Sequence, residues 1–249
     1  MRIRDVTDDE VAAFQENGWV KLSGLIDPAT ASELLRAGHR QIGGPGHVSG
    51  RTSAMWDIKA FPAMEGIEPF RSVAFHGTMG RNAQRLMNRG RLTGSPVPVR
   101  YLNDSVSCKR AENSRTLPHE DHGGQGLDRI GSVAVWIALD EATPEMGTMR
   151  FLTGAFREGP FGHVTLTDIL EQYPRLTDLY SWSEPQVYQP GDATVHHCCT
   201  IHESLPNTTD RGRWAYILSY ASADALRREN PLEYKGFDDA RNPIVVSGA

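Results

Sequence analysis

The chain has 249 residues, of which 39% are hydrophobic and 23% charged, and its formal net charge is -5. This length can bury a substantial core in one large domain or two small ones, and the composition is that of an ordinary globular protein. The acidic balance argues against nucleic acid or an anionic membrane as a partner and favours a small-molecule ligand.

The amino-terminal part of the chain carries helix signals. Thr7 with Glu10 makes a capping box before an apolar run, and Asp27-Pro28 supplies an N-cap and an N1 proline for the run that follows. Between these two helices the segment 18–26 predicts a strand, and a third helix is expected within 68–88.

From about residue 97 the pattern changes to short β segments bounded by Gly, Pro, Asn or Asp. These segments are 97–104, 132–140, 147–154, 185–204 and 213–222, with one helix expected at 165–174. Helices followed by many strands indicate an α+β fold whose second part is a sandwich or barrel. Because we find no repeat or linker, we expect one domain over 1–249, with a helical flank over about 1–96 and a β core over about 97–223.

Neither a membrane span nor a secretory signal is predicted. No run of about 18 apolar residues occurs, and the first ten residues are polar and acidic. The three cysteines, Cys108 and the adjacent Cys198 and Cys199, form neither an even disulfide framework nor a CxxC pair. Since this usage suits a reducing compartment, we expect a cytoplasmic protein.

The triplet His119-Glu120-Asp121 has metal-ligand character. In an extended segment, side chains at i and i+2 point to the same side, so His119 and Asp121 can converge on one ion while Glu120 points elsewhere. Nine histidines and 31 acidic residues give about one such triplet by chance. The triplet is therefore informative only together with a third ligand.

His202, which ends a predicted strand, offers that third ligand. A turn follows and Arg213 begins the next strand, so a symmetric hairpin would place His202 nearly opposite Arg213. A guanidinium binds a carboxylate by two parallel hydrogen bonds and could anchor the far end of a dicarboxylate chelated to the metal. Two histidines and one aspartate leave open positions on the ion, as in the non-haem iron oxygenases.

With these residues the chain resembles the phytanoyl-CoA dioxygenase-like branch of the iron(II)/2-oxoglutarate-dependent oxygenases. The family pattern is an H-x-D triplet followed about eighty residues later by a PGD…H-x-S-x-P-N…R block, and 8–35 and 132–156 also resemble the family. The resemblance covers nearly the whole chain. The matching positions are His119, Asp121, Pro190, Gly191, Asp192, His202, Ser204, Pro206, Asn207 and Arg213.

The resemblance implies a double-stranded β-helix (jelly roll, cupin-like) with flanking amino-terminal helices. It implies an enzyme that oxidises its substrate with O2, most simply by hydroxylation, while 2-oxoglutarate is converted to succinate. Iron(II) is expected to be bound by His119, Asp121 and His202. Because the carboxylate ligand Asp121 is present, no ligand position is freed for chloride as in the related halogenases.

The resemblance also implies a binding site for 2-oxoglutarate. Arg213 and Ser204 are expected to bind its distal carboxylate, and Trp136 and Lys109 to line the site.

The chain departs from the family pattern at two places, and two neighbouring features invite other interpretations. Glu120 stands where Gln is common and would repel an anionic co-substrate, and TGAF at 153–156 replaces the usual PGSH. His122 is expected to face away from the metal or lie in a loop. The HHCC run at 196–199 suggests zinc, but neighbours on a strand alternate faces and would not all reach one ion, so packing is favoured.

Loops at 42–54, 110–117 and 155–184 are expected to form the mouth of the pocket, the first being rich in Gly, Ser and Pro and a candidate lid. Apolar residues that could line it are Met55, Trp56, Phe61, Phe156, Phe161 and Trp182.

A specialised metabolite from a natural-product pathway is the favoured substrate class. The alternative is an acyl-CoA or carrier-bound chain, whose phosphates would need basic residues, and 108–115 is a modest candidate for them. A non-redox cupin-like metal protein and a catalytically silent binding module on the same fold stay open as other interpretations. Substrate identity, type of oxidation and oligomeric state are not predicted.

Overall fold

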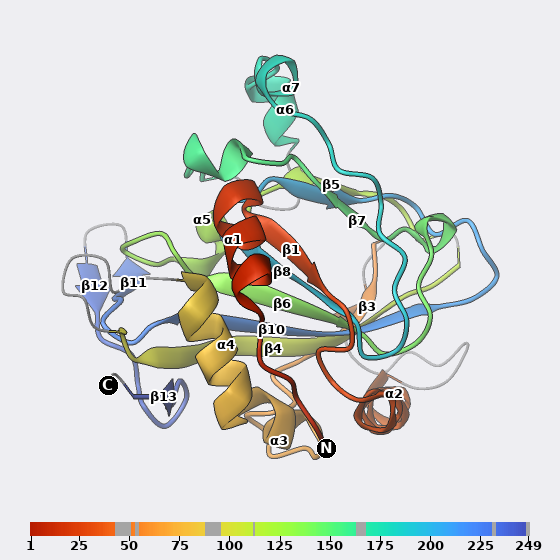
Figure 1. Cartoon of the computed structure of the whole chain (residues 1–249), viewed down its shortest axis with the longest axis vertical. Helices are drawn as coiled ribbons and strands as arrows, with labels where there is room; N and C mark the ends of the chain where they lie inside the picture. The colour runs from red at the N-terminus through yellow and green to blue at the C-terminus, as the bar shows by residue number, and fades with distance from the viewer. Residues whose placement is uncertain are drawn as a thin grey trace.

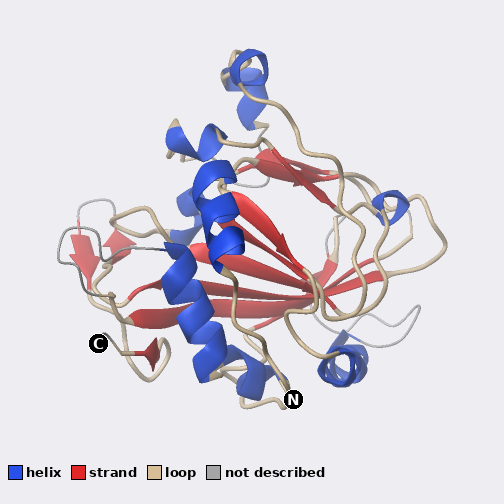
Figure 2. Cartoon of the chain, in the orientation of Figure 1, coloured by secondary structure: helices blue, strands red, loops and turns tan. Residues whose placement is uncertain are grey.

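The structure is a computed structural model that describes residues 1–42, 51–52, 55–87, 96–111, 113–162, 168–230 and 233–247. Two facing antiparallel sheets and a set of helices make up the fold, with β5 and β7 above the large sheet and α2 and α3 below it (Figure 1). Figure 2 shows that the helices gather mainly around the large sheet. The predicted α+β double-stranded β-helix is confirmed.

The large sheet runs in the order β1-β8-β6-β10-β4-β3-β2, with β13 also paired to β4. Its strands are β1 (Trp19–Leu22), β2 (Arg51–Thr52), β3 (Asp57–Ala60), β4 (Val99–Lys109), β6 (Val133–Ala138), β8 (Ala193–His197), β10 (Arg213–Ser222) and β13 (Ile244–Val246). The small sheet has the order β5-β9-β7 and consists of β5 (Thr116–His119), β7 (Met149–Phe151) and β9 (His202–Ser204). A separate hairpin pairs β11 (Arg227–Asn230) with β12 (Glu233–Lys235).

The helices are α1 (Asp8–Asn17), α2 (Pro28–Ile42), α3 (Phe70–Ala74), α4 (Gly77–Met87), α5 (His122–Gln125), α6 (Ile169–Gln172) and α7 (Leu176–Leu179), with 3-10 turns η2 (Pro144–Met146) and η3 (Ala155–Arg157). The first two begin where the sequence predicts. The capping box of Thr7 and Glu10 is present, and Asp27 accepts a hydrogen bond from the Thr30 backbone N–H at 2.9 Å. Within the described ranges, no helix has the length and apolarity needed to cross a bilayer.

The predicted third helix is wrong in one respect, because it is two helices. The chain leaves the helical path after α3, and the His76 Nδ1 atom then accepts a hydrogen bond from the Thr78 backbone N–H at 3.2 Å. A ring nitrogen therefore satisfies one of the orphan donors at the start of α4. The helix predicted at 165–174 is reduced to the single turn α6 in the described part, and 163–167 and most of 42–54 lie outside it.

The two faces of the large sheet carry different residues. On β10, Trp214, Tyr216 and Leu218 pack into the main apolar core together with α2, α3 and α4. The alternate residues Arg213, Ile217 and Ser219 line a cavity on the opposite face. The period-two pattern of the strand thus separates the helix-covered core from the space between the sheets.

The predicted hairpin between His202 and Arg213 is wrong, because β9 and β10 belong to different sheets. His202 is paired with His119 on β5 and with Phe151 on β7, whereas Arg213 is paired with Lys109 on β4. The connection between the two strands crosses from the small sheet to the large one. The Asn207 side chain fixes this crossing by donating to the carbonyls of Lys109 at 2.9 Å and Arg211 at 2.6 Å.

Candidate active site

Three side chains of metal-ligand type converge at one end of the small sheet. His119 ends β5 and His202 begins β9, and their rings lie 4.2 Å apart between centroids. Asp121 follows two residues after β5, and its Oδ1 atom lies 3.9 Å from the Nε2 atom of His202. One ligand atom from each of the three lies within 4.8 Å of the others. The structure therefore brings the predicted triad together.

A turn, and not strand alternation, positions Asp121. The strand ends at His119, and Asp121 has a helical backbone (φ -81°, ψ -28°) at the start of α5. The backbone N–H groups of Asp121 and His122 donate to the carbonyl of Cys198 at 2.9 and 3.0 Å. The sequence predicted that strand alternation would bring His119 and Asp121 together, and this reason is wrong. The two side chains do converge.

Hydrogen bonds to backbone carbonyls fix the tautomers of both triad histidines. The Nδ1 atom of His119 donates to the Leu117 carbonyl at 2.7 Å, and that of His202 donates to the Thr200 carbonyl at 3.0 Å. In each ring the Nε2 lone pair stays available, which is the usual arrangement in a metal-binding histidine. Burial lowers the pKa of both imidazoles, which favours their neutral, ligating form.

His196 is a third histidine at the site that sequence reasoning missed. Its Nε2 atom lies 3.0 Å from the Oδ2 atom of Asp121, and because a carboxylate only accepts, His196 is the donor. Burial opposes the ionisation of Asp121, but this hydrogen bond and the nearby imidazoles hold the pKa of its carboxyl below the usual range. The Asp121 carboxylate is thus ionised and oriented.

Arg213 lies buried on the large sheet without a carboxylate partner among the described residues. Its guanidinium donates to the Gly147 carbonyl and lies 5.2 Å above the Trp136 ring, while its Nε atom is buried and unpaired. Burial lowers its pKa to about 10, so the group is still charged near neutral pH. The nearby carboxylate of Glu203 pairs with two other arginines, Arg115 and Arg150.

Lys109 and Ser204 form a polar pair beside Arg213. The Lys109 ammonium donates to the Ser204 hydroxyl at 2.8 Å, and that hydroxyl lies 3.2 Å from the Thr116 hydroxyl. Lys109 is fully buried, and burial together with repulsion from Arg213 lowers its pKa to about 7. Ser204 lines the cavity, whereas Lys109 stands behind it and does not.

A cavity of about 320 Å³ between the sheets joins the triad to Arg213. Of the predicted site residues, all but Lys109 line it. Lining residues that sequence reasoning missed include Ile58, Asn103, Ser107, Thr116, Gln125, Ala134, Met149, His196, Ile217 and Ser219. Several of them could have been predicted from the alternation of side chains along a strand. Residues 103 and 107 on β4 share a face, as do 213, 217 and 219 on β10.

Comparison with known proteins places this architecture in a family. The family model described as Phytanoyl-CoA dioxygenase (PhyH) matches residues 14–215. The chain belongs to the PhyH family. It is thereby a member of the iron(II)/2-oxoglutarate-dependent dioxygenases, as the resemblance implied.

Individual proteins that resemble this chain are distant from it in sequence. A methylphosphonate hydroxylase of Gimesia maris is 24% identical over 235 residues, which cover 90% of this chain and 84% of the relative. The carbocyclase SnoK from nogalamycin biosynthesis has a similar structure, with a TM-score of 0.81, 20% identity and coverage of 99% of this chain and 100% of that one. The epimerase SnoN, in complex with Fe3+, alpha ketoglutarate and nogalamycin RO, has a TM-score of 0.73, 22% identity and coverage of 96% and 98%.

The departure from the PhyH pattern at Glu120 lies away from the cavity. The Glu120 carboxylate accepts hydrogen bonds from the backbone N–H groups of Phe161 and Gly162, both at 2.9 Å, and burial raises its pKa. It therefore holds the segment after residue 160 and does not line the space beside Arg213. His122 also does not line the cavity and lies against the Cys198 thiol.

Of the six apolar residues expected at the pocket mouth, only Trp56 lines the cavity. Phe156 packs on His197 and Phe161 on Tyr173, and the other three lie elsewhere. The loops expected at the mouth contribute Trp56, next to the first loop, and Thr116, in the second; the described part of 155–184 contributes no lining residue.

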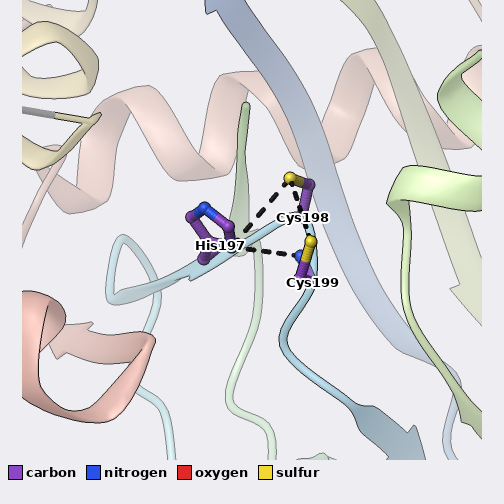
Figure 3. Close-up of side chains that lie close together, drawn as sticks. All are labelled: His197, Cys198 and Cys199. Carbon is purple, nitrogen blue, oxygen red and sulfur yellow. Dashed lines mark hydrogen bonds between the residues drawn. The ribbon is translucent and has the colours of Figure 1, made fainter. Parts of the chain in front are cut away.

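The reasoning that dismissed the HHCC run is wrong in its geometry. Strand β8 ends at His197, and Cys198 and Cys199 lie in the turn that follows, so the side chains do not alternate. One ligand atom from each of His197, Cys198 and Cys199 lies within 4.8 Å of the others (Figure 3). His196 points instead to Asp121.

Proposed function

We propose that this chain is an iron(II)/2-oxoglutarate-dependent dioxygenase that hydroxylates a small neutral metabolite, with His119, Asp121 and His202 as the iron ligands. One observation carries the proposal. Two imidazole Nε2 atoms and an ionised carboxylate meet at the wall of a cavity that also holds a buried guanidinium, beside which the described residues place no anion. That combination suits a ferrous ion and a dicarboxylate bound together.

The donor set fits iron on its own chemistry. The ring orientations are fixed from behind by the carbonyls of Leu117 and Thr200, and the Asp121 carboxylate is held by His196. A two-histidine, one-carboxylate set with open positions is the arrangement of non-haem iron oxygenases. Iron bound there with 2-oxoglutarate and O2 would supply the oxidising power to break a C–H bond, and the protein would orient the substrate and exclude water.

The wall at Arg213 fits the distal carboxylate of 2-oxoglutarate. A buried cation without an anionic partner is costly, and an incoming carboxylate would complete its hydrogen bonding. The hydroxyls of Ser204 and Thr116 line the same part of the cavity and could donate to the same carboxylate. Lys109 would then act through Ser204 by fixing the orientation of that hydroxyl, and Trp136 would support the guanidinium plane.

The remaining wall of the cavity favours a neutral, polar substrate. Asn103, Ser107 and Ser219 line it, and their side chains have no hydrogen-bond partner among the described residues. Asn103 and Ser219 are directly paired across β4 and β10. These uncharged donors and acceptors would recognise hydroxyl or carbonyl groups of a substrate, beside the apolar side chains of Ile58 and Ile217.

An acyl-CoA substrate is disfavoured by the ion pairs of the basic segment. Lys109 is buried, Arg110 pairs with Asp57, and Arg115 pairs with Glu203. The cationic groups of this segment are therefore committed to internal partners. Similarity to the nogalamycin carbocyclase and epimerase also supports a natural-product metabolite, and ring closure or epimerisation is the alternative reaction outcome that product analysis would reveal.

We further propose that the whole chain works as one oxygenase domain in the cytoplasm. Strand β1 pairs with β8, and β3 pairs with β4, so the amino-terminal segment is hydrogen-bonded into the same sheet as the later strands. The three cysteines are free thiols, which suits a reducing compartment.

The test has a binding stage and a turnover stage. Under argon, iron(II) and 2-oxoglutarate should give the visible absorption band of an iron-2-oxo acid chelate, and under air a panel of neutral metabolites should drive formation of succinate. Asp121→Ala should abolish both, while Arg213→Ala should weaken 2-oxoglutarate binding about 30-fold or more, the cost of losing a buried charge pair. Asp178→Ala, on an exposed residue of α7, is the matched control.

Wild-type behaviour of Asp121→Ala would refute the ligand assignment. Oxygen-independent turnover of a metabolite without succinate would instead favour a non-redox metal enzyme of the cupin type. Binding of 2-oxoglutarate without any oxygen-coupled turnover across the panel would favour a silent binding module.

A further inference from the structure

A second group of metal-ligand atoms lies behind the triad, in the turn after β8. The Sγ atom of Cys198 is 3.9 Å from the Sγ atom of Cys199 and 3.9 Å from the Nδ1 atom of His197 (Figure 3). Both thiols are fully buried. Neither this thiol pair nor His197 lines the active-site cavity, so the group is separate from the triad.

The surroundings of Cys198 suit a thiolate. The Gly131 backbone N–H donates to its sulfur at 3.3 Å, and N–H donors to sulfur stabilise metal-bound thiolates. His122 also lies against this thiol, and its Nδ1 atom is buried without a hydrogen-bond partner in the described structure. Interactions with Cys199, His122 and His197 hold the pKa of Cys198 below its usual range despite burial.

His197 presents the correct nitrogen to the group. Its Nδ1 atom accepts a hydrogen bond from the Cys199 backbone N–H at 3.1 Å, so this nitrogen carries the lone pair and Nε2 carries the hydrogen. A cation at Nδ1 would replace that hydrogen bond. The ring makes a tilted contact with Phe156, with 5.2 Å between centroids, and the His197 backbone N–H donates to the Gly18 carbonyl at 2.8 Å.

The geometry favours a bound cation over a disulfide between the adjacent cysteines. Neighbouring Cα atoms are about 3.8 Å apart, which is shorter than the usual 4.4–6.8 Å across a disulfide, and the sulfurs would have to close to about 2.05 Å. Two thiolates bound tetrahedrally to zinc at about 2.3 Å are themselves about 3.8 Å apart. The observed 3.9 Å between the Cys198 and Cys199 sulfurs therefore needs almost no movement.

We propose that His197, Cys198 and Cys199 form a second metal site, for a thiophilic cation of the zinc type, with His122 as the candidate fourth ligand. The neighbouring Cys198 and burial raise the pKa of the Cys199 thiol, so the cation itself would displace its proton on binding. Two thiolates would then neutralise a divalent ion in this buried position, and mixed sulfur and imidazole ligands select zinc among the common divalent ions. The site is structural. The Cys198 carbonyl accepts the backbone N–H groups of Asp121 and His122, so a cation here would fix the turn that carries Asp121.

Cobalt(II) titration of the reduced, chelator-stripped full chain under argon tests this site. The triad offers no sulfur, so a near-ultraviolet thiolate-to-cobalt charge-transfer band would come from a cysteine site and not from the triad. We expect two equivalents of cobalt to bind, one of them with this band, and one equivalent of zinc to remove the band. Cys198→Ser and Cys199→Ser should each weaken the binding of the cobalt that gives this band by at least about 100-fold, because a direct ligand is lost.

Two matched controls separate this site from the iron centre. Cys108→Ser, which changes the remaining buried thiol, should keep the band. His119→Ala should keep the band and lose the other equivalent of cobalt. Absence of the band in the wild-type chain would overturn the proposal, as would a band that persists in both serine variants. The wild-type titration tests the site even if a serine variant does not fold.

Discussion

His196 shows how one side chain next to the triad can set metal affinity. It donates to Oδ2 of Asp121 at 3.0 Å, while Oδ1 faces the His202 ring. Without that hydrogen bond the carboxylate loses its fixed orientation. We expect His196→Ala to weaken iron(II) binding by about 10–100-fold, the usual effect of removing a hydrogen-bond partner of a metal ligand.

The control for His196 is a conservative replacement. His196→Gln keeps an N–H donor and should recover most of the iron affinity. Iron(II) titration under argon, followed by protein fluorescence, measures both variants. Equal loss of affinity in the two variants would mean that the ring acts by packing and not by its hydrogen bond.

Lys109 makes a second prediction at this scale, through the pH dependence of stability. Its folded pKa is about 7, and its unfolded pKa is about 10.4. Between these values the unfolded chain holds a proton that the folded chain lacks, so the free energy of unfolding rises with pH. The burial penalty is full below pH 7 and disappears above the unfolded pKa.

Lys109→Met should therefore stabilise the ligand-free protein at pH 7, by about 2–4 kcal/mol after the lost hydrogen bond to Ser204 is subtracted. The gain should shrink steadily as the pH approaches 10. Denaturant unfolding across this range, beside the exposed-lysine control Lys235→Met, measures it. A gain in stability that does not depend on pH would contradict the lowered pKa of Lys109.

Single residues of the site were predictable to different degrees. His119, Asp121, His202 and Arg213 could be found because their types and spacing form a pattern along the chain. His196 could not, because its role depends on β8 lying beside β6 in a way that brings its ring to Asp121. The contact joins residues 75 apart, and no local pattern records it.

At the scale of elements, features fixed by neighbours in sequence were predicted well. The starts of α1 and α2 depend on caps within four residues, and both are where the sequence places them. The hairpin from His202 to Arg213 was wrong because alternation says which face a residue takes and does not say which strand is its neighbour. Here β9 pairs with β5 and β7, and β10 with β4 and β6.

The crossing between β9 and β10 nevertheless preserves the functional prediction. His202 and Arg213 come from opposite sheets and still face the same cavity. A hairpin would have placed them side by side on one wall, whereas two facing sheets place them across a space that can hold a ligand. Two facing sheets are therefore better suited than the predicted hairpin to a dicarboxylate that reaches from the triad to Arg213.

At the scale of the whole molecule, we expect the buried cation of Arg213 to couple ligand binding to stability. In the ligand-free protein this guanidinium has a buried, unpaired Nε atom and no anion beside it among the described residues. An unpaired buried charge lowers stability, and a bound dicarboxylate would remove that penalty. Removal of the charge should therefore raise the stability of the ligand-free protein and reduce the stability that the ligand adds.

We expect Arg213→Met to be more stable than the wild type without ligands, by about 1–4 kcal/mol, or roughly 2–4 °C in Tm for each kcal/mol. With iron(II) and 2-oxoglutarate under argon this advantage of Arg213→Met should shrink by about 2.7 kcal/mol. Ligand at about 100 times its Kd stabilises the wild type by about 2.7 kcal/mol, and the variant should gain only from iron. Thermal unfolding measures both states, with the exposed-residue variant Arg241→Met as control. If both proteins gain equally from 2-oxoglutarate, its carboxylate binds somewhere other than Arg213.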